Sequence, residues 1–88
     1  MQFQLPDSYR KRYLERRVVD LSVLEKGRLE DFRRIGHQIR GSAKSFGFSD
    51  LETIALRLEQ IDHGTLLELA PRILVDFKNC LSALGEQT

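Results

Sequence analysis

Apolar residues recur along this chain at the three- and four-residue spacing that is typical of amphipathic α-helices. This pattern predicts four helices joined by short connections, at about residues 6–25, 28–46, 49–62 and 65–84. No stretch alternates apolar and polar residues as a half-buried strand does, and no Asn-Gly or Asp-Gly hairpin dipeptide occurs. The prediction is an all-α fold, an antiparallel up-down-up-down four-helix bundle, in a single domain of residues 1–88.

Turn and capping residues support these helix ends. Gly27 and Gly47 stand where the first two helices should stop, because glycine readily adopts the left-handed conformation found after a helix. Capping patterns of the type Ser/Thr-x-x-Glu predict that Ser49 and Thr65 cap the last two helices. Pro71 lies beyond the first turn of the last helix, where it either kinks the helix or delays its regular start to the preceding residue.

The first predicted helix has one apolar face, which should pack toward the core and comprises Tyr13, Leu14, Val18, Leu21 and Leu24. Phe3 and Leu5 precede this helix and are expected to fold over the open end of the bundle. Basic residues also gather early in the helix, and we interpret them as a solvated face with ion pairs about one turn apart. They are Arg10, Lys11, Arg12, Arg16 and Arg17.

Composition narrows the functions that this chain can have. Hydrophobic residues make up 41% and charged residues 31% of the sequence, as in an ordinary globular protein. No apolar run approaches the ~20 residues that span a membrane, and the N-terminus lacks the features of a signal peptide, so we expect a cytoplasmic protein. Cys80 is the only cysteine, which excludes a disulfide framework and a cysteine-based metal site. A net charge of +1 argues against a dedicated nucleic-acid binder.

One histidine stands apart from the apolar pattern of the second predicted helix. At about 100° per residue, the apolar side chains of this helix form one stripe and His37 points to the opposite side. The stripe comprises Phe32, Ile35, Ile39, Ala43 and Phe46. The opposite face comprises Glu30, Arg33, His37, Arg40, Gly41 and Lys44. We therefore expect the imidazole to be exposed, with cations one turn away in each direction.

Two glycines accompany this histidine inside the helix, although each costs about 1 kcal/mol of helix stability relative to alanine. Gly41 lies one turn after His37 on the same face, where the missing side chain would clear space for a partner. Gly36 lies nearer the edge of the apolar stripe, and we interpret it as a site of close helix–helix packing.

The segment from His37 to Gly47 carries a motif. It reads histidine, a free position, an aliphatic residue, a basic residue, glycine, two small residues, two free positions, an apolar residue and glycine. Together with Leu51, Leu58 and Glu59, this segment resembles the histidine phosphotransfer (HPt) domain of bacterial phosphorelays. The resemblance covers most of the chain, since that family is a four-helix bundle with its histidine on the second helix.

The resemblance implies that His37 accepts a phosphoryl group from the aspartyl phosphate of a response-regulator receiver domain, or passes one to such an aspartate. Arg40, where the family usually has lysine, and Lys44 would stabilise the phosphoryl oxygens by positive charge. Glu59 would accept a hydrogen bond from the Nδ1–H of His37 and leave Nε2 as the nucleophile. A solvated surface glutamate is the equal alternative, and Gln60 is a neighbouring substitute for the same role.

Contacts to the partner are expected around the histidine. The residues concerned are Arg33, Arg34, Gly41, Ser45 and Gln60. Mg²⁺ would come from the receiver domain, because the sequence has no metal-ligand motif and implies no cofactor of its own. Nothing resembles an ATP-binding kinase domain, so no autokinase activity is expected, and a hybrid histidine kinase is a further candidate partner. Two features depart from the family: the chain is compact, and Gly36 stands where the family commonly has alanine or another apolar residue. They leave open whether the domain is free-standing or part of such a kinase.

Two other functions are weighed against this one. The same fold could serve as a non-catalytic docking module, an adaptor or inhibitor for a receiver domain or a kinase. A nucleic-acid binder using the basic first helix conflicts with the near-neutral net charge. His63 is interpreted as a turn residue, and Ser42 and Ser45 have no neighbouring base that would make them nucleophiles. The sequence does not specify the phosphoryl donor, the acceptor, the direction of transfer or the oligomeric state.

Overall fold

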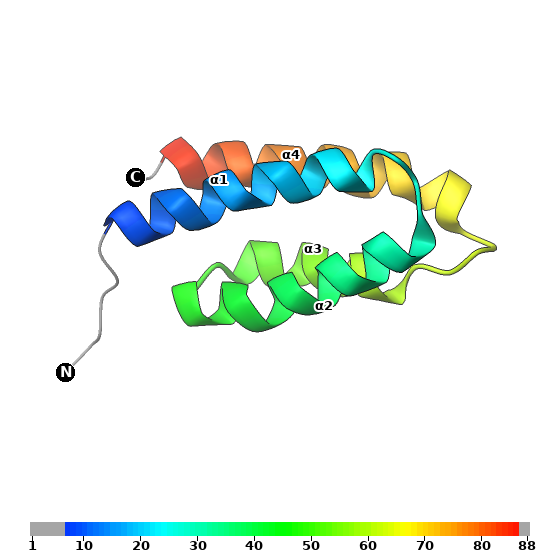
Figure 1. Cartoon of the computed structure of the whole chain (residues 1–88), viewed down its shortest axis with the longest axis horizontal. Coiled ribbons are helices and arrows are strands. Elements are labelled where there is room, and N and C mark those ends of the chain that lie inside the picture. The colour runs from blue at the N-terminus through cyan, green and yellow to red at the C-terminus, as the bar shows by residue number, and fades with distance from the viewer. Residues whose placement is uncertain (1–6, 87–88) are drawn as a thin grey trace.

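The computed structural model describes residues 7–86. Over this range the chain forms four helices and no strand, namely α1 (Asp7–Leu24), α2 (Leu29–Phe46), α3 (Ser49–Gln60) and α4 (Leu66–Glu86) (Figure 1). The predicted all-helical class is therefore confirmed. Within the same range, no helix combines the length and the hydropathy that crossing a bilayer requires. Phe3 and Leu5, which are expected to cover the end of the bundle, lie outside the described residues.

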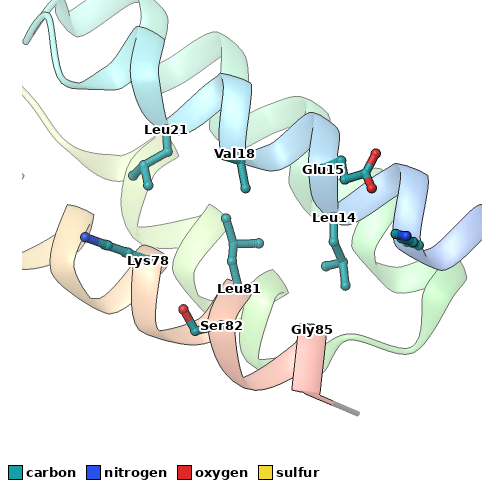
Figure 2. A pocket seen from close by; sticks show the side chains of 9 residues that line it. Leu14, Glu15, Val18, Leu21, Lys78, Leu81, Ser82 and Gly85 are labelled. Atoms are coloured by element: carbon teal, nitrogen blue, oxygen red, sulfur yellow. The ribbon is translucent and has the colours of Figure 1, made fainter. Parts of the chain in front are cut away.

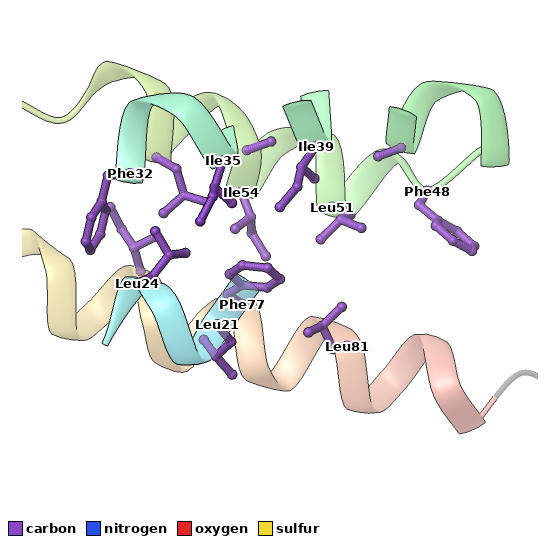
Figure 3. Close-up of a cluster of buried hydrophobic side chains, with 14 of the residues drawn as sticks. Leu21, Leu24, Phe32, Ile35, Ile39, Phe48, Leu51, Ile54, Phe77 and Leu81 are labelled. Atoms are coloured by element: carbon purple, nitrogen blue, oxygen red, sulfur yellow. The ribbon is translucent and has the colours of Figure 1, made fainter. Parts of the chain in front are cut away.

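The helices form a bundle of two packed pairs (Figure 1). α2 and α3 make the most extensive helix–helix contact, and α1 packs mainly on α4. The core lies between the two pairs, where Phe77 projects from α4 toward α2 and α3 (Figure 3). Phe77 and Phe32 are fully buried. The predicted stripe of α2 is confirmed, because Phe32, Ile35, Ile39 and Ala43 are buried and Phe46 is partly buried against the core.

An apolar groove runs between α1 and α4 on their outer side, and residues of both helices line it (Figure 2). Its cavity volume is about 430 Å³, and Leu14, Leu21 and Leu81 contribute its apolar wall. Val18 also lines this groove and is 54% exposed, so the prediction that it faces the core is wrong. The reason is the groove itself, because Val18 lies on its α1 wall and the open space between α1 and α4 leaves its side chain uncovered. All lining residues come from α1 and α4, which places the groove apart from the helix of His37.

The predicted glycine stops are confirmed. Gly47 has φ of 74° and ends α2, with its N–H donating to the Lys44 carbonyl over 3.1 Å and the Phe48 N–H donating to the Ala43 carbonyl over 3.0 Å. Gly27 has the same φ, and its N–H donates to the Leu24 carbonyl over 2.9 Å. Both positions need positive φ, which a residue with a Cβ adopts only at a steric cost.

The predicted caps of the last two helices are wrong in detail. Phe48, not Ser49, precedes the first turn of α3, and its carbonyl accepts the Glu52 N–H over 3.0 Å. Burial of the Phe48 ring explains this, because the ring stacks on Phe46 and brings its own backbone to the start of the helix. The Thr65 hydroxyl bonds back to Asp62 Oδ1 over 3.0 Å instead of capping α4.

Pro71 lies inside α4, which is continuous from Leu66. A regular start of the helix at residue 70 is therefore wrong. Proline has no N–H for the carbonyl of Leu67, one turn earlier. Leu67 is 91% exposed, so water can satisfy that carbonyl and the helix tolerates the proline.

The basic residues early in α1 are only partly a solvated face. Arg17 pairs with Asp20 three residues later, with 2.8 Å between Nε and Oδ2. The Arg17 guanidinium also lies 4.5 Å from the centroid of the Tyr13 ring, and that of Arg10 lies 5.3 Å from the Phe48 ring. These cation–π contacts hold Arg10 and Arg17 against an aromatic cluster that comprises Tyr13, Phe46 and Phe48. The other three cations are exposed, as predicted.

Candidate functional site

His37 stands on the outer face of α2. Its side chain is 72% exposed, whereas the two preceding residues, Ile35 and Gly36, are buried. The predicted exposed face of this helix is confirmed throughout. Its other members, all exposed, are Glu30, Arg33, Arg40, Gly41 and Lys44.

Glu59 of α3 reaches this histidine. Its Oε1 lies 3.0 Å from Nδ1 of His37, although the residues are 22 positions apart in the sequence. The contact joins a carboxylate oxygen to a ring nitrogen, and the tautomer of His37 decides which role that nitrogen plays in it. Glu59 is 24% exposed, so it is only partly solvated, and its role toward the histidine stays a prediction.

The same carboxylate also holds Arg40. Nε of Arg40 lies 3.2 Å from Oε2 of Glu59, so the two oxygens of one carboxylate contact two side chains of α2. An ion pair this exposed contributes less than about 1 kcal/mol to stability. Its consequence is geometric, because it brings the guanidinium of Arg40 and the imidazole of His37 to one carboxylate.

Lys44 carries the other cation predicted for the site. It is exposed on the same face of α2, one turn beyond Arg40. Within residues 7–86 it forms no ion pair, in contrast to Arg40. The positive charge of Lys44 is therefore not neutralised by a neighbouring carboxylate.

The two glycines of α2 have opposite surroundings. A Cβ on Gly36 would lie 2.7 Å from the amide nitrogen of Glu59 and 2.8 Å from the carbonyl oxygen of Ala55. The interpretation of Gly36 as a point of close helix–helix packing is confirmed. A Cβ on Gly41 would meet nothing within 4 Å, so the space above His37 is open on this side. That a partner uses this space stays a prediction.

The remaining predicted contact residues differ in their freedom. Nε of Arg33 donates to the Ile61 carbonyl over 3.4 Å, which directs this arginine to the end of α3. Arg34 bonds to Oδ1 of Asp31 over 3.0 Å, and this carboxylate is almost completely buried. Ser45 and Gln60 are exposed, as a partner contact requires. The structure thus brings together His37, Arg40 and Glu59, and it turns the two arginines at the start of α2 toward other partners.

Sequence reasoning missed a polar link directly behind the site. The Tyr13 hydroxyl lies 2.7 Å from Oγ of Ser42, which also donates to the Gln38 carbonyl over 3.0 Å. Ser42 therefore connects α2 to α1 and is not placed as a nucleophile. A half-buried tyrosine usually has a hydrogen-bond partner for its hydroxyl, so the existence of a partner could have been predicted. The identity of that partner could not, because Tyr13 and Ser42 are 29 residues apart in the sequence. Leu56, three residues before Glu59 on α3, is a further exposed apolar residue that was not singled out.

The second histidine and the acidic residues form no comparable centre. His63 is exposed in the connection between α3 and α4, as predicted for a turn residue. In the described part of the chain, no three His, Cys, Asp or Glu side chains are grouped closely enough to hold a metal ion.

Comparison with known protein families places these observations in context. The chain matches the Hpt domain over residues 12–87. Comparisons with curated proteins and with solved structures gave no significant match. Hpt domains take part in two-component phosphorelays, where they interact with receiver domains and histidine kinases. Because the match spans most of the sequence and includes the complete helix of His37, the chain belongs to the Hpt domain family.

Proposed function

We propose that this domain is a phosphorelay intermediate that carries a phosphoryl group on His37. It receives the group from the aspartyl phosphate of one receiver domain and passes it to the aspartate of another. The observation that supports this proposal best is the orientation of the imidazole. Nδ1 contacts Glu59 over 3.0 Å, and the ring is 72% exposed, so Nε2 is left open to a partner.

The transfer step follows from this orientation. The Nε2 lone pair attacks the phosphorus atom, an Nε2–P bond forms, and the bond between phosphorus and the aspartyl oxygen breaks with its electrons leaving on the carboxylate. The ring keeps its Nδ1 proton and becomes a phosphoimidazolium cation. Glu59 would stabilise this cation through the bond that it already makes to Nδ1. Return of the phosphoryl group to an aspartate reverses each change.

Positive charge around Nε2 would stabilise the phosphoryl oxygens during transfer. Lys44 is available for this role, because it forms no ion pair within the described residues. Arg40 lies nearer to the histidine but is paired with Glu59, so it would act after exchanging this partner for a phosphoryl oxygen. Mg²⁺ is proposed to come with the receiver domain, and a cytoplasmic location belongs to the same proposal.

The bundle itself provides the rigid support for this face. We infer that the helices alternate in direction, as an antiparallel up-down-up-down bundle. The short connections 25–28, 47–48 and 61–65 support this topology, and the colour along the chain in Figure 1 reverses its course at each of them. Antiparallel packing of α2 and α3 would bring Glu59, near the end of α3, beside His37 in the middle of α2.

Phosphoryl transfer from a radiolabelled receiver domain, with Mg²⁺, tests the proposal. We expect label on the wild type and on the His63→Gln control, which alters the only other histidine, and none on His37→Gln. The label should be lost in acid and survive base, as phosphohistidine does. If the wild type binds receiver domains but takes no label from them, the domain is a non-catalytic docking module. Phosphoramidate, a small donor that needs no protein partner, reports separately whether the imidazole can accept the group.

A further inference from the structure

The residue before the histidine lies where α2 and α3 are in close contact. Gly36 is buried, and a Cβ there would lie 2.7 Å from the amide nitrogen of Glu59. Glu59 is also the residue whose carboxylate contacts His37 and Arg40. We propose that Gly36 is a positioning residue of the phosphorylation site, which sets the separation of α2 and α3 at which Glu59 reaches His37. This inference rests on the proposed function of His37.

The atoms that surround Gly36 explain why a side chain cannot be accommodated locally. Two of the three nearest neighbours are backbone atoms of α3, the amide nitrogen of Glu59 and the carbonyl oxygen of Ala55 at 2.8 Å. The third is Cβ of Leu58 at 3.0 Å. Helix backbone and a Cβ atom cannot rotate out of the way as the tip of a long side chain can. An added methyl group therefore moves α3 as a whole, by the several tenths of an ångström that separate these distances from ordinary contact at 3.4 Å.

Such a displacement acts directly on the contact with His37. The distance from Nδ1 of His37 to Oε1 of Glu59 is 3.0 Å, a usual N–H···O distance, and an increase of several tenths of an ångström would take it beyond the upper limit of about 3.2 Å. The same carboxylate has a second contact with α2, since its Oε2 lies 3.2 Å from Nε of Arg40, so a movement of α3 changes both distances at once. Both contacts have to be rebuilt together if α3 moves. The separation of the two helices thus controls the orientation of the ring.

Gly41 provides the matched control. It lies in the same helix, five residues later, and a Cβ on it would meet nothing within 4 Å. The substitution Gly41→Ala therefore makes the same chemical change, and the same change in helix propensity, without touching α3. A difference between the two alanine variants reports the helix–helix contact alone.

The test measures the imidazole itself as well as the reaction. Nitrogen-15 NMR of the His37 ring reports which nitrogen carries the proton, and phosphorylation by phosphoramidate reports the reactivity of Nε2. We expect Gly36→Ala to retain its helical circular dichroism but to lose the preference for the Nδ1 proton, with phosphorylation slowed by about tenfold, since ~1 Å of misplacement can cost ~100-fold in rate. Gly41→Ala, compared by the ring proton alone because Gly41 belongs to the predicted partner surface, should match the wild type in the NMR measurement.

A double variant distinguishes positioning from packing. If Gly36 acts through Glu59, then Gly36→Ala combined with Glu59→Gln is phosphorylated no more slowly than Glu59→Gln alone. Additive losses would overturn the proposal, and so would a Gly36→Ala variant that melts at a lower temperature but keeps the wild-type ring proton and rate. The proposed function fails separately, if the wild type takes no phosphoryl group from either donor, and the NMR comparison remains decisive in that case.

A further variant covers the outcome in which Gly36→Ala does not fold. Glu59→Asp shortens the side chain by one methylene and leaves the contact between the helices untouched. It imitates a retreat of α3, so we expect the same loss of the Nδ1 proton preference. If Glu59→Asp behaves as the wild type does, the reach of Glu59 does not limit the orientation of His37 and the proposal is wrong.

Discussion

Arg40 on α2 and Glu59 on α3 form an ion pair, with 3.2 Å between Nε and Oε2, on the carboxylate whose other oxygen contacts His37. In the proposed transfer, the cation that shares this carboxylate with His37 is therefore paired before a phosphoryl group arrives. A phosphoryl group on His37 would be a second anion within reach of Arg40. Arg40 could then leave the Glu59 carboxylate for a phosphoryl oxygen, and its positive charge would stay paired throughout. Arg40 and Glu59 act as one unit in this description.

Replacing Arg40 should affect transfer more than stability. We expect Arg40→Gln to slow phosphoryl transfer to His37 by about tenfold or more, because a hydrogen bond to a charged group is worth about 1.5–3 kcal/mol. Arg40→Lys should lie between this variant and the wild type, since it keeps the charge but not the planar guanidinium. The free energy of unfolding should fall by less than about 1 kcal/mol in both. Transfer rates and urea denaturation check these values.

Arg57 supplies the control for Arg40. It forms an exposed ion pair with Asp76, in which Nη1 lies 2.8 Å from Oδ2. This pair also joins two helices but does not involve His37. Arg57→Gln should leave the transfer rate unchanged. Equal rates for Arg40→Gln and the wild type would show that Lys44 alone supplies the positive charge.

Much of the fold could be predicted because it depends on local periodicity. The buried stripe of α2 and the glycine at its end follow from helical spacing and from the positive φ that Gly47 adopts. Predictions failed where a distant partner decides the outcome. Val18 has the spacing of a core residue, yet it lines an open groove between α1 and α4 and is exposed. Phe48 takes the cap of α3 from Ser49 because its ring is buried in a cluster that no local pattern reveals.

The site shows the same division. The exposure of His37 follows from the helical pattern of one segment, and the contact with Glu59 was suggested by a family resemblance. The pair between Arg40 and Glu59 could not be predicted, since it depends on how close α2 and α3 approach. Local competition also matters, because Arg34 is held by Asp31 three residues earlier. A basic side chain on the same helix face as His37 is therefore a weaker indication of function than a basic side chain that has no carboxylate partner beside it.

Tyr13 should stabilise the domain through its hydroxyl. Tyr13→Phe keeps the ring, which stacks on Phe46 with 4.3 Å between centroids, but removes the bond of 2.7 Å to Ser42. We expect a loss of about 1 kcal/mol in the free energy of unfolding, as is typical for one hydrogen bond. Tyr9→Phe, at an exposed position of the same helix, should have no effect in urea denaturation. Equal stabilities of the two variants would contradict a role for the link between α1 and α2.

Cys80 should react slowly with thiol reagents in the folded protein. Burial, and to a smaller extent the negative charge of Asp50, raises the pKa of its thiol, so less thiolate is present at pH 8. We expect alkylation by iodoacetamide to be several-fold slower in the native state than in urea at the same pH. The chain contains a single cysteine, so the denatured protein is its own control. Equal rates would mean that Cys80 is freely accessible.

Asp62 should make the stability of the domain sensitive to acid. Hydrogen bonds from the Thr65 hydroxyl and the Thr65 N–H lower the pKa of this carboxyl below its ordinary value. A lowered folded-state pKa means that the stabilisation is complete above the unfolded-state value of about 3.9 and is lost as the pH falls through the folded-state value. Asp62→Asn keeps an acceptor oxygen but does not titrate. Urea midpoints of the two proteins should therefore differ by a constant amount from pH 7 to about pH 5 and converge below about pH 4. Thr65→Val, which removes the hydroxyl, should weaken this pH dependence, and a constant difference down to pH 2.5 would show that Asp62 has no such coupling to folding.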